Sequence, residues 1–136
     1  MFTVWNSLVF DEDYTNVTTA TFRNVEIDSM KDGVFHKWKS LKMLTVSHNY
    51  ITNISWLIFG STFNKLWYLD LSYNKIESIP DLTFTKIKFP TLIVLNLAGN
   101  KIQTISEKTF PLEYWTTNQM REIYMGNNSI KRINYK

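Results

Sequence analysis

Apolar residues recur along the chain in one fixed order around an asparagine. If the places of a unit are numbered 1 to 14, apolar residues fall at places 1, 4, 6, 11 and 14, and asparagine falls at place 9. The four segments that follow this order are "LKMLTVSHNYITNI" from Leu41, "LWYLDLSYNKIESI" from Leu66, "LIVLNLAGNKIQTI" from Leu92 and "MREIYMGNNSIKRI" from Met120. Self-similarity at a fixed period predicts a stack of repeated supersecondary units that share one core.

Each unit predicts a strand followed by a turn. Alternate residues of a strand face opposite sides, so Leu66, Leu69 and Leu71 point inward while Tyr68 and Asp70 point outward. After the strand the chain bends, and an inward amide can hydrogen-bond the backbone groups that the bend leaves unpaired. We therefore predict a structural ladder of asparagines that bridges neighbouring turns, with the members Asn49, Asn74, Asn100 and Asn128.

A second column consists of phenylalanines. Phe59, Phe84 and Phe110 each follow the last isoleucine of a unit by five residues, and Phe35 lies 24 residues before Phe59. The column predicts that a phenylalanine anchors the return segment of every turn in the core.

The two ends of the chain depart from the repeat. Residues 22–30 predict an atypical first strand with Phe22, Val25 and Ile27 inward and Met30 in place of the asparagine, and residues 2–10 predict a strand that covers the open end. At the other end the fourth unit is incomplete and no polar closing repeat follows. Repeat arrays need capping units for solubility. We therefore expect a longer array that has been truncated, with end-to-end self-association as the alternative.

The pattern LxxLxLxxNxIxxI followed by phenylalanine resembles the leucine-rich repeats, specifically their typical extracellular class, over residues 41–136. Residues 1–40 are similar in style to the N-terminal caps of secreted arthropod members, such as the mosquito leucine-rich immune proteins. The resemblance implies an α/β, β-rich solenoid with a curved parallel sheet on its concave face and irregular or short helical convex segments. It implies a single domain over 1–136, with a cap in 1–40 and four repeat units in 41–136.

The composition and charge of the chain indicate which kinds of partner and which cellular compartment suit the protein. The chain of 136 residues has 15 Lys and Arg, 12 Asp and Glu and a net charge of +3, and its basic residues form no basic-aromatic stripe for nucleic acid. No apolar run is long enough to span a membrane. The N-terminus lacks the basic region of a signal peptide, so the chain is cytoplasmic or has lost its signal. The repeat period favours a secreted protein, whereas the absence of cysteine favours a reducing compartment.

The chain has few candidates for catalytic or metal-binding residues. The two histidines, His36 and His48, show no metal-ligand spacing, and the chain has no cysteine. Glu26 and Asp28 could share a strand face, but solvated charges of the cap explain them better than a catalytic pair does. We therefore expect no enzyme activity, no cofactor and no metal site.

The residues that the repeat leaves free to vary are the outward ones. Several of them are apolar or aromatic, and such side chains are enriched at the centre of protein interfaces. The alternative is that flanking loops cover some of them, Trp67 and Ile93 in particular. We predict a partner-binding surface on the concave face formed by Met43, Trp67, Tyr68, Asp70, Tyr73, Ile93, Val94 and Tyr124.

The expected function is a non-enzymatic module that recognises a protein partner, with a role in extracellular innate immunity. The alternative is a structural module that self-associates through its uncapped C-terminal edge. Three N-x-S/T sequences, at Asn16, Asn53 and Asn127, are glycosylation candidates if the protein is secreted.

Overall fold

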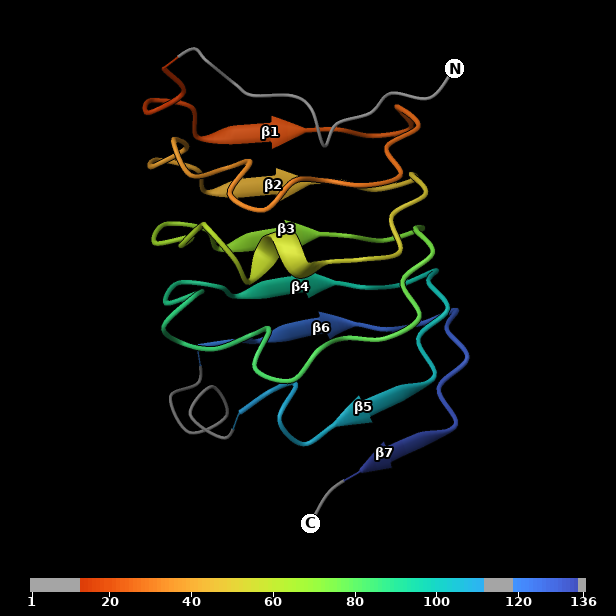
Figure 1. Ribbon diagram of the computed structural model, residues 1–136. Helices are drawn as coiled ribbons and strands as arrows, with labels where there is room; N and C mark the ends of the chain where they lie inside the picture. Colours follow the sequence, from red (N-terminus) through yellow and green to blue (C-terminus); the bar gives the residue numbers. More distant parts are fainter. Residues whose placement is uncertain (1–12, 112–118, 135–136) are drawn as a thin grey trace.

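The computed structural model describes residues 13–111 and 119–134, in which the chain coils through successive turns and places one strand of each turn beside the next (Figure 1). A single 3-10 helix, η2 (Ser55–Leu57), occurs in this part of the chain. The strands are β1 (Thr19–Thr21), β2 (Met43–Thr45), β3 (Tyr68–Asp70), β4 (Val94–Asn96), β5 (Thr104–Ser106), β6 (Glu122–Tyr124) and β7 (Arg132–Asn134).

Five of the strands form one parallel sheet in the order β1-β2-β3-β4-β6, and β5 pairs with β7 in a second, two-stranded sheet. Residues at the same place of successive units lie opposite one another, so that Leu44 is in register with Leu69 and Leu69 with Leu95. All the pairs are parallel because each strand is reached after one complete turn. The sequence prediction of a β-rich solenoid with a parallel sheet is confirmed.

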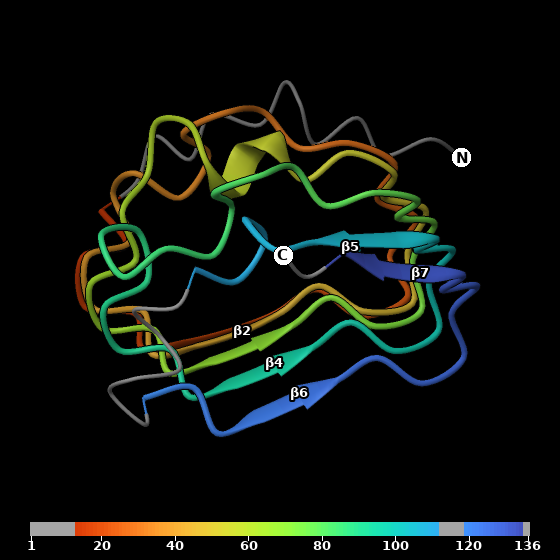
Figure 2. The ribbon, with the colours of Figure 1, turned by 90° about the horizontal axis from the view of Figure 1, so that it is seen from below.

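The core lies between the two sides of the coil. Seen along the stack, the five-stranded sheet forms one side, and β5, β7 and η2 lie opposite it (Figure 2). The inward residues Leu44, Leu69 and Leu95 are fully buried, as are Ile51 and Ile76 after the turn. Burial of one such side chain stabilises the fold by about 1.5–3 kcal/mol. Each turn contributes to this continuous core and relies on its neighbours to cover it.

The asparagine at place 9 joins its own turn to the preceding one. In Asn74, the side-chain Oδ1 accepts a hydrogen bond from the Ile51 N–H at 3.1 Å. The Nδ2 of the same side chain donates to the Val46 carbonyl of the preceding turn at 2.7 Å and to the Leu71 carbonyl of its own turn at 3.1 Å. Asn74 is buried, and this amide satisfies backbone groups that the bend would otherwise leave unpaired.

The other three asparagines at place 9 repeat this arrangement. Each Oδ1 accepts from the N–H of an isoleucine in the preceding turn, namely Ile27, Ile76 or Ile102. Each Nδ2 donates to a carbonyl of the preceding turn and to one of its own turn. The members with these contacts are Asn49, Asn100 and Asn128.

The first strand lies nearer the N-terminus than the sequence suggested. Strand β1 is Thr19–Thr21, and its Ala20 pairs with Leu44, so the prediction of a strand over residues 22–30 is wrong. Ile27 is buried as expected, but Val25 is 39% exposed. The reason is that Val25, and not Met30, stands at the asparagine place, where the Asn49 Oδ1 meets its N–H. The strand predicted for residues 2–10 lies outside the described residues.

The prediction of a buried phenylalanine in every turn is wrong at one position, Phe59. Phe84 and Phe110 are buried and stack with ring centroids 5.6 Å apart, whereas Phe59 is 56% exposed. In that turn the chain forms η2, which buries Trp56 instead, and the Trp56 ring lies 5.7 Å from Phe35. Because of this short helical turn, Trp56 enters the core in place of Phe59.

A further aromatic column was missed. Trp38, Phe63 and Phe89 each precede the first leucine of a unit by three residues, and all three are buried. The rings of Phe63 and Phe89 stack at 5.3 Å with an angle of 2° between their planes. The constant spacing to Leu41, Leu66 and Leu92 is the sequence signal that identifies this column.

Replacement of Asn74 by alanine should lower the free energy of unfolding by about 1–3 kcal/mol, because the partner groups in two turns remain buried without it. Urea unfolding followed by circular dichroism measures the change. The control is Asn64→Ala, at an exposed asparagine outside the ladder, which should change stability by less than about 0.5 kcal/mol. Equal stability of Asn74→Ala and the wild type would contradict the bridging role.

Candidate protein-binding surface

The outer sheet face is the side of the five-stranded sheet that points away from the core, and it is formed by the strand residues at places 3 and 5 of each unit. The strand register aligns these places across all five strands. At place 3 the residues are Thr19, Met43, Tyr68, Val94 and Glu122, and at place 5 they are Thr21, Thr45, Asp70, Asn96 and Tyr124.

The structure brings most of the predicted binding residues together on or beside this face. Met43, Tyr68 and Val94 lie side by side in register on β2, β3 and β4, and each is half-buried. Trp67 stands immediately before β3, is 37% exposed and meets the Tyr68 ring edge-on at 5.8 Å. Ile93 holds the equivalent place before β4 and is half-buried. The flanking segments therefore cover Trp67 only in part, and the rest of its side chain is exposed to solvent.

Two tyrosines of this face are paired with carboxylates. The Tyr124 hydroxyl donates a hydrogen bond to the Glu122 carboxylate at 2.6 Å, and this bond and the carboxylate charge raise the pKa of Tyr124. Burial is the main cause that raises the pKa of Tyr68, and the charge of Asp70 and a hydrogen bond to it act in the same direction. Both phenols therefore stay protonated to a higher pH than an unperturbed tyrosine does.

Asp70 is more enclosed than an outward strand residue need be. Its side chain is only 9% exposed, and its Oδ1 accepts the Ser72 N–H at 2.9 Å. Asn96, at the same place of the next unit, accepts the Ala98 N–H in the same way at 3.1 Å. Both residues thus begin the bend after the strand with the same local hydrogen bond.

Tyr73 lies away from the other predicted residues, at the edge where the strands end. It occupies place 8, where φ is positive in every unit, as at Asn24, His48, Gly99 and Asn127. Left-handed backbone costs a residue with a Cβ about 1–2 kcal/mol, less for asparagine and least for glycine. The Tyr73 ring stacks on His48 at 4.6 Å and covers Gly99 on the other side, where a Cβ would lie 2.5 Å from the ring.

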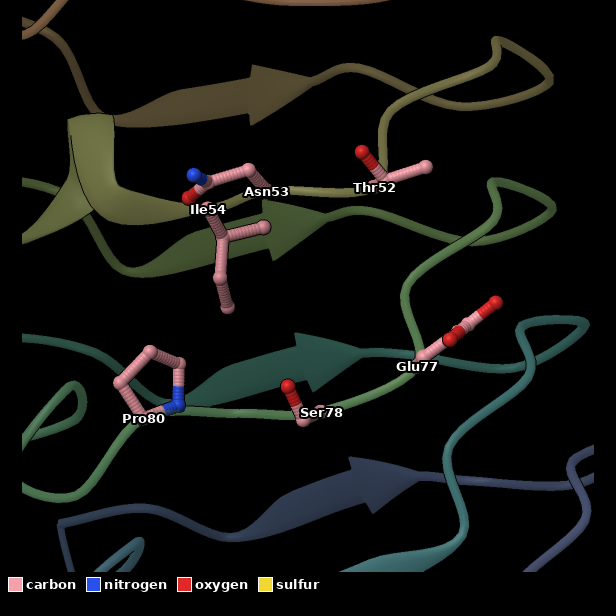
Figure 3. Close-up of a pocket in the computed structure, with 6 residues that line it drawn as sticks. All are labelled: Thr52, Asn53, Ile54, Glu77, Ser78 and Pro80. Atoms are coloured by element: carbon pink, nitrogen blue, oxygen red, sulfur yellow. The ribbon is translucent and has the colours of Figure 1, made fainter.

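The three candidate glycosylation residues, Asn16, Asn53 and Asn127, are all exposed. Asn53 also lines a shallow groove of about 460 Å³ between two consecutive turns on the return side of the coil. Figure 3 shows the side chains that border this groove, which are Thr52, Asn53, Ile54, Glu77, Ser78 and Pro80. Sequence reasoning missed the groove, although Pro80 has no N–H to pair across it.

The described residues contain neither a cluster of metal-ligating side chains nor a helix that could span a membrane. Within residues 13–111 and 119–134 there is no group of three or more His, Cys, Asp and Glu that could hold a metal ion. In the same ranges no helix is long and apolar enough to cross a membrane. The outer sheet face presents aromatic rings, hydroxyls, an amide and two carboxylates.

Stacked strand-and-turn units joined by buried asparagines, with variable residues facing outward, define a solenoid of the repeat-protein class. The chain belongs to the leucine-rich repeat family, because the family model described as "Leucine rich repeat" matches residues 16–76 and 64–111. It is 32% identical to Tsukushi of Xenopus tropicalis over 130 residues, which are 93% of this chain and 34% of that protein. It is 31% identical to lumican of Rattus norvegicus over 114 residues, 79% of this chain and 31% of lumican.

The chain thus spans about a third of the length of these relatives. Among solved structures, it is similar to a chain of the Toll–Spatzle complex of Drosophila, with a TM-score of 0.70 and 20% identity over 88% of this chain and 17% of that one. An internalin from Listeria monocytogenes gives a TM-score of 0.58 with 15% identity, over 90% of this chain and 36% of that one. At these identities the two likenesses establish the fold alone.

Gly99→Ala should destabilise the protein by about 1–2 kcal/mol, because alanine is strained at positive φ and its Cβ meets the Tyr73 ring. Thermal and urea unfolding measure the loss. The control is Gly126→Ala, at place 7 of the next unit, where φ is not positive and an added Cβ meets nothing within 4 Å. If the loss at Gly99 stays the same in a Tyr73→Ala background, the ring makes no contribution and backbone strain alone is responsible.

Proposed function

We propose that this chain is a non-enzymatic recognition module that binds a partner protein through its outer sheet face. The observation that carries the proposal is the group of aromatic and apolar side chains on and beside this face, although the repeat requires no apolar residue there. Trp67 and Tyr124 are 37% and 51% exposed, and Met43, Tyr68 and Val94 are half-buried around them. Solenoids present extended concave surfaces of this kind to their ligands.

The composition of the face supports a protein as the partner. Tyrosine, tryptophan and methionine are enriched in interface cores, and tryptophan and tyrosine dominate binding energy where they are central and become fully desolvated. Trp67 and Tyr68 already contact each other, so little side-chain freedom remains to be lost when a partner covers them.

The proposal places the protein outside the cell, with a role in innate immunity. Its support is the repeat period, the resemblance to secreted arthropod immune proteins and the exposure of all three N-x-S/T asparagines. A glycan needs space around its asparagine, and Asn16, Asn53 and Asn127 all provide it. Cytoplasmic residence is the alternative.

Trp67→Ala and Tyr68→Ala should each weaken partner binding by about 2 kcal/mol or more while the protein stays folded. The partner is first captured from extracellular fluid, and its affinity for each variant is measured by surface plasmon resonance or calorimetry. Phe59→Ala serves as the control, because Phe59 is an exposed aromatic residue on the return side of the coil. Wild-type affinity in both sheet-face variants would reject the outer sheet face as the binding surface.

Protein purified from secreting animal cells should lose mass when an N-glycosidase removes its glycans. Asn→Gln variants at the three positions would then show which of them carry sugar. An unchanged mass of the secreted protein would remove glycosylation from the proposal, and failure of secretion from a signal-bearing chain would argue for the cytoplasm.

A second function, assembly through the C-terminal edge, is favoured by one specific observation. Among the described residues β6 pairs only with β4, and β7 pairs only with β5, so each offers a free strand edge. Ile133 is 51% exposed there, and Ile123, Met125 and Ile130 are half-buried. Light scattering distinguishes the two functions: assembly requires a mass that rises with concentration and falls when Ile133 becomes lysine, whereas a constant monomer mass excludes it.

A further inference from the structure

The residues at place 2, which precede the strands, form a column along the rim of the outer sheet face. Backbone hydrogen bonds fix this place-2 column, because each N–H donates to the place-2 carbonyl of the preceding turn. The Trp67 N–H donates to the Lys42 carbonyl at 2.9 Å. The Ile93 N–H donates to the Trp67 carbonyl, and the Arg121 N–H donates to the Ile93 carbonyl, each at 2.9 Å. The four residues therefore stand one above another in successive turns.

The place-2 column is apolar in the middle and cationic at both ends. Trp67 and Ile93 occupy its centre, where Trp67 is 37% exposed and Ile93 is half-buried. Lys42 and Arg121 occupy the turns on either side, and both are exposed. Beside the column, at place 3, lie the half-buried side chains of Met43, Tyr68 and Val94.

The two carboxylates of the outer sheet face already accept hydrogen bonds from nearby donors of the protein. Asp70 is buried, and its Oδ1 accepts the Ser72 N–H at 2.9 Å. Glu122 accepts the Tyr124 hydroxyl at 2.6 Å. The place-2 column itself contains no acidic residue, because its member in the first turn is a threonine. The two exposed cations of this column are thus open to acidic groups of a partner.

The spacing of the column matches one face of an α-helix. Successive strands lie about 4.8 Å apart, so Lys42 and Arg121 are separated by three spacings, or about 14 Å. Residues i, i+3, i+7 and i+10 of a helix share one face, and the last three lie about 4.5, 10.5 and 15 Å along the axis from the first. These positions agree with the successive turns to within about 1 Å. An extended segment repeats its side chains on one face about every 6.8 Å and does not match.

We propose that the outer sheet face binds an amphipathic α-helix of its partner protein, which lies along the place-2 column and crosses the strands. Apolar residues at i+3 and i+7 of this helix pack on Trp67 and Ile93, and acidic residues at i and i+10 pair with Lys42 and Arg121. A helix is about 10 Å wide and therefore also covers place 3, about 3.3 Å further along each strand. This inference rests on the proposed function and specifies the form and the charge of the partner surface.

The first test is a titration of isotope-labelled protein, followed by NMR, with a lactam-bridged helical peptide that carries Glu, Leu, Leu and Glu at i, i+3, i+7 and i+10. The backbone signals of the place-2 column should shift saturably. The control peptide has the same composition, but both glutamates are moved to the opposite face of the helix, and it should bind about tenfold more weakly. No saturable shift at the column, or equal affinity of the two peptides, would overturn the proposal.

A second control peptide identifies the form of the occupant. It keeps the sequence of the patterned peptide but lacks the bridge and carries a proline in the middle, which prevents the helix. It should bind at least tenfold more weakly than the bridged peptide. If it binds as tightly, an extended segment fits the face as well as a helix does, and the proposal is overturned.

Charge reversal at the two ends of the column tests the predicted ion pairs. Lys42→Glu and Arg121→Glu should each weaken binding of the bridged peptide about tenfold, and a peptide with lysine in place of the facing glutamate should restore it. Lys101→Glu is the control, because Lys101 is exposed at place 10, away from the outer sheet face, and its reversal should leave binding unchanged. Effects no larger than that of the control, or the absence of any rescue by a lysine peptide, would overturn the proposal.

The same variants separate this inference from the proposed function. If the partner protein binds Trp67→Ala weakly but binds Lys42→Glu and Arg121→Glu as tightly as the wild type, the acidic helix is rejected while recognition by the face stands. Wild-type affinity of the partner for both Trp67→Ala and Tyr68→Ala rejects the proposed function itself, and this inference with it.

Discussion

The buried asparagine amide that joins two turns is the interaction on which the rest of the structure depends. A chain that bends after every strand leaves backbone N–H and C=O groups inside the core, where unpaired polar groups are costly. In Asn74 one side chain supplies both an acceptor and a donor, and it reaches Ile51 and Val46 of the preceding turn as well as Leu71 of its own. Because the same contact recurs in the neighbouring units, the turns stack in constant register and the leucines form one core.

This scaffold separates stability from recognition. Inward places are occupied by leucine, isoleucine, valine, methionine or asparagine, while the outward strand places carry residues as different as threonine, tyrosine and aspartate. At place 8 the backbone is left-handed in every unit, and residues as different as asparagine, histidine, tyrosine and glycine occupy that place.

The repeat could be predicted from the sequence because Leu, Asn and Ile recur at constant places that the core dictates. The first strand could not, because Val25 occupies the asparagine place of the cap and the pattern therefore gives no register. Phe59 was assigned to the core because its spacing fits, but the 3-10 turn buries Trp56 instead. On the outer face, the alternation of residues predicts which side chains point outward but not how exposed they are: Asp70 points outward, yet it is buried and bonded to the Ser72 N–H.

Hydrogen exchange of single backbone amides in an Asn100→Ala variant tests the bridging role of the asparagines most directly. The Ile76 N–H donates to the Asn100 Oδ1 at 3.1 Å, whereas the Ile27 N–H, two turns earlier, is held by Asn49. Since units of a solenoid interact mainly with their neighbours, the loss should be local. The account predicts that exchange at Ile76 accelerates about tenfold or more while exchange at Ile27 changes much less. Unchanged protection of Ile76, or equal acceleration at both amides, would contradict it.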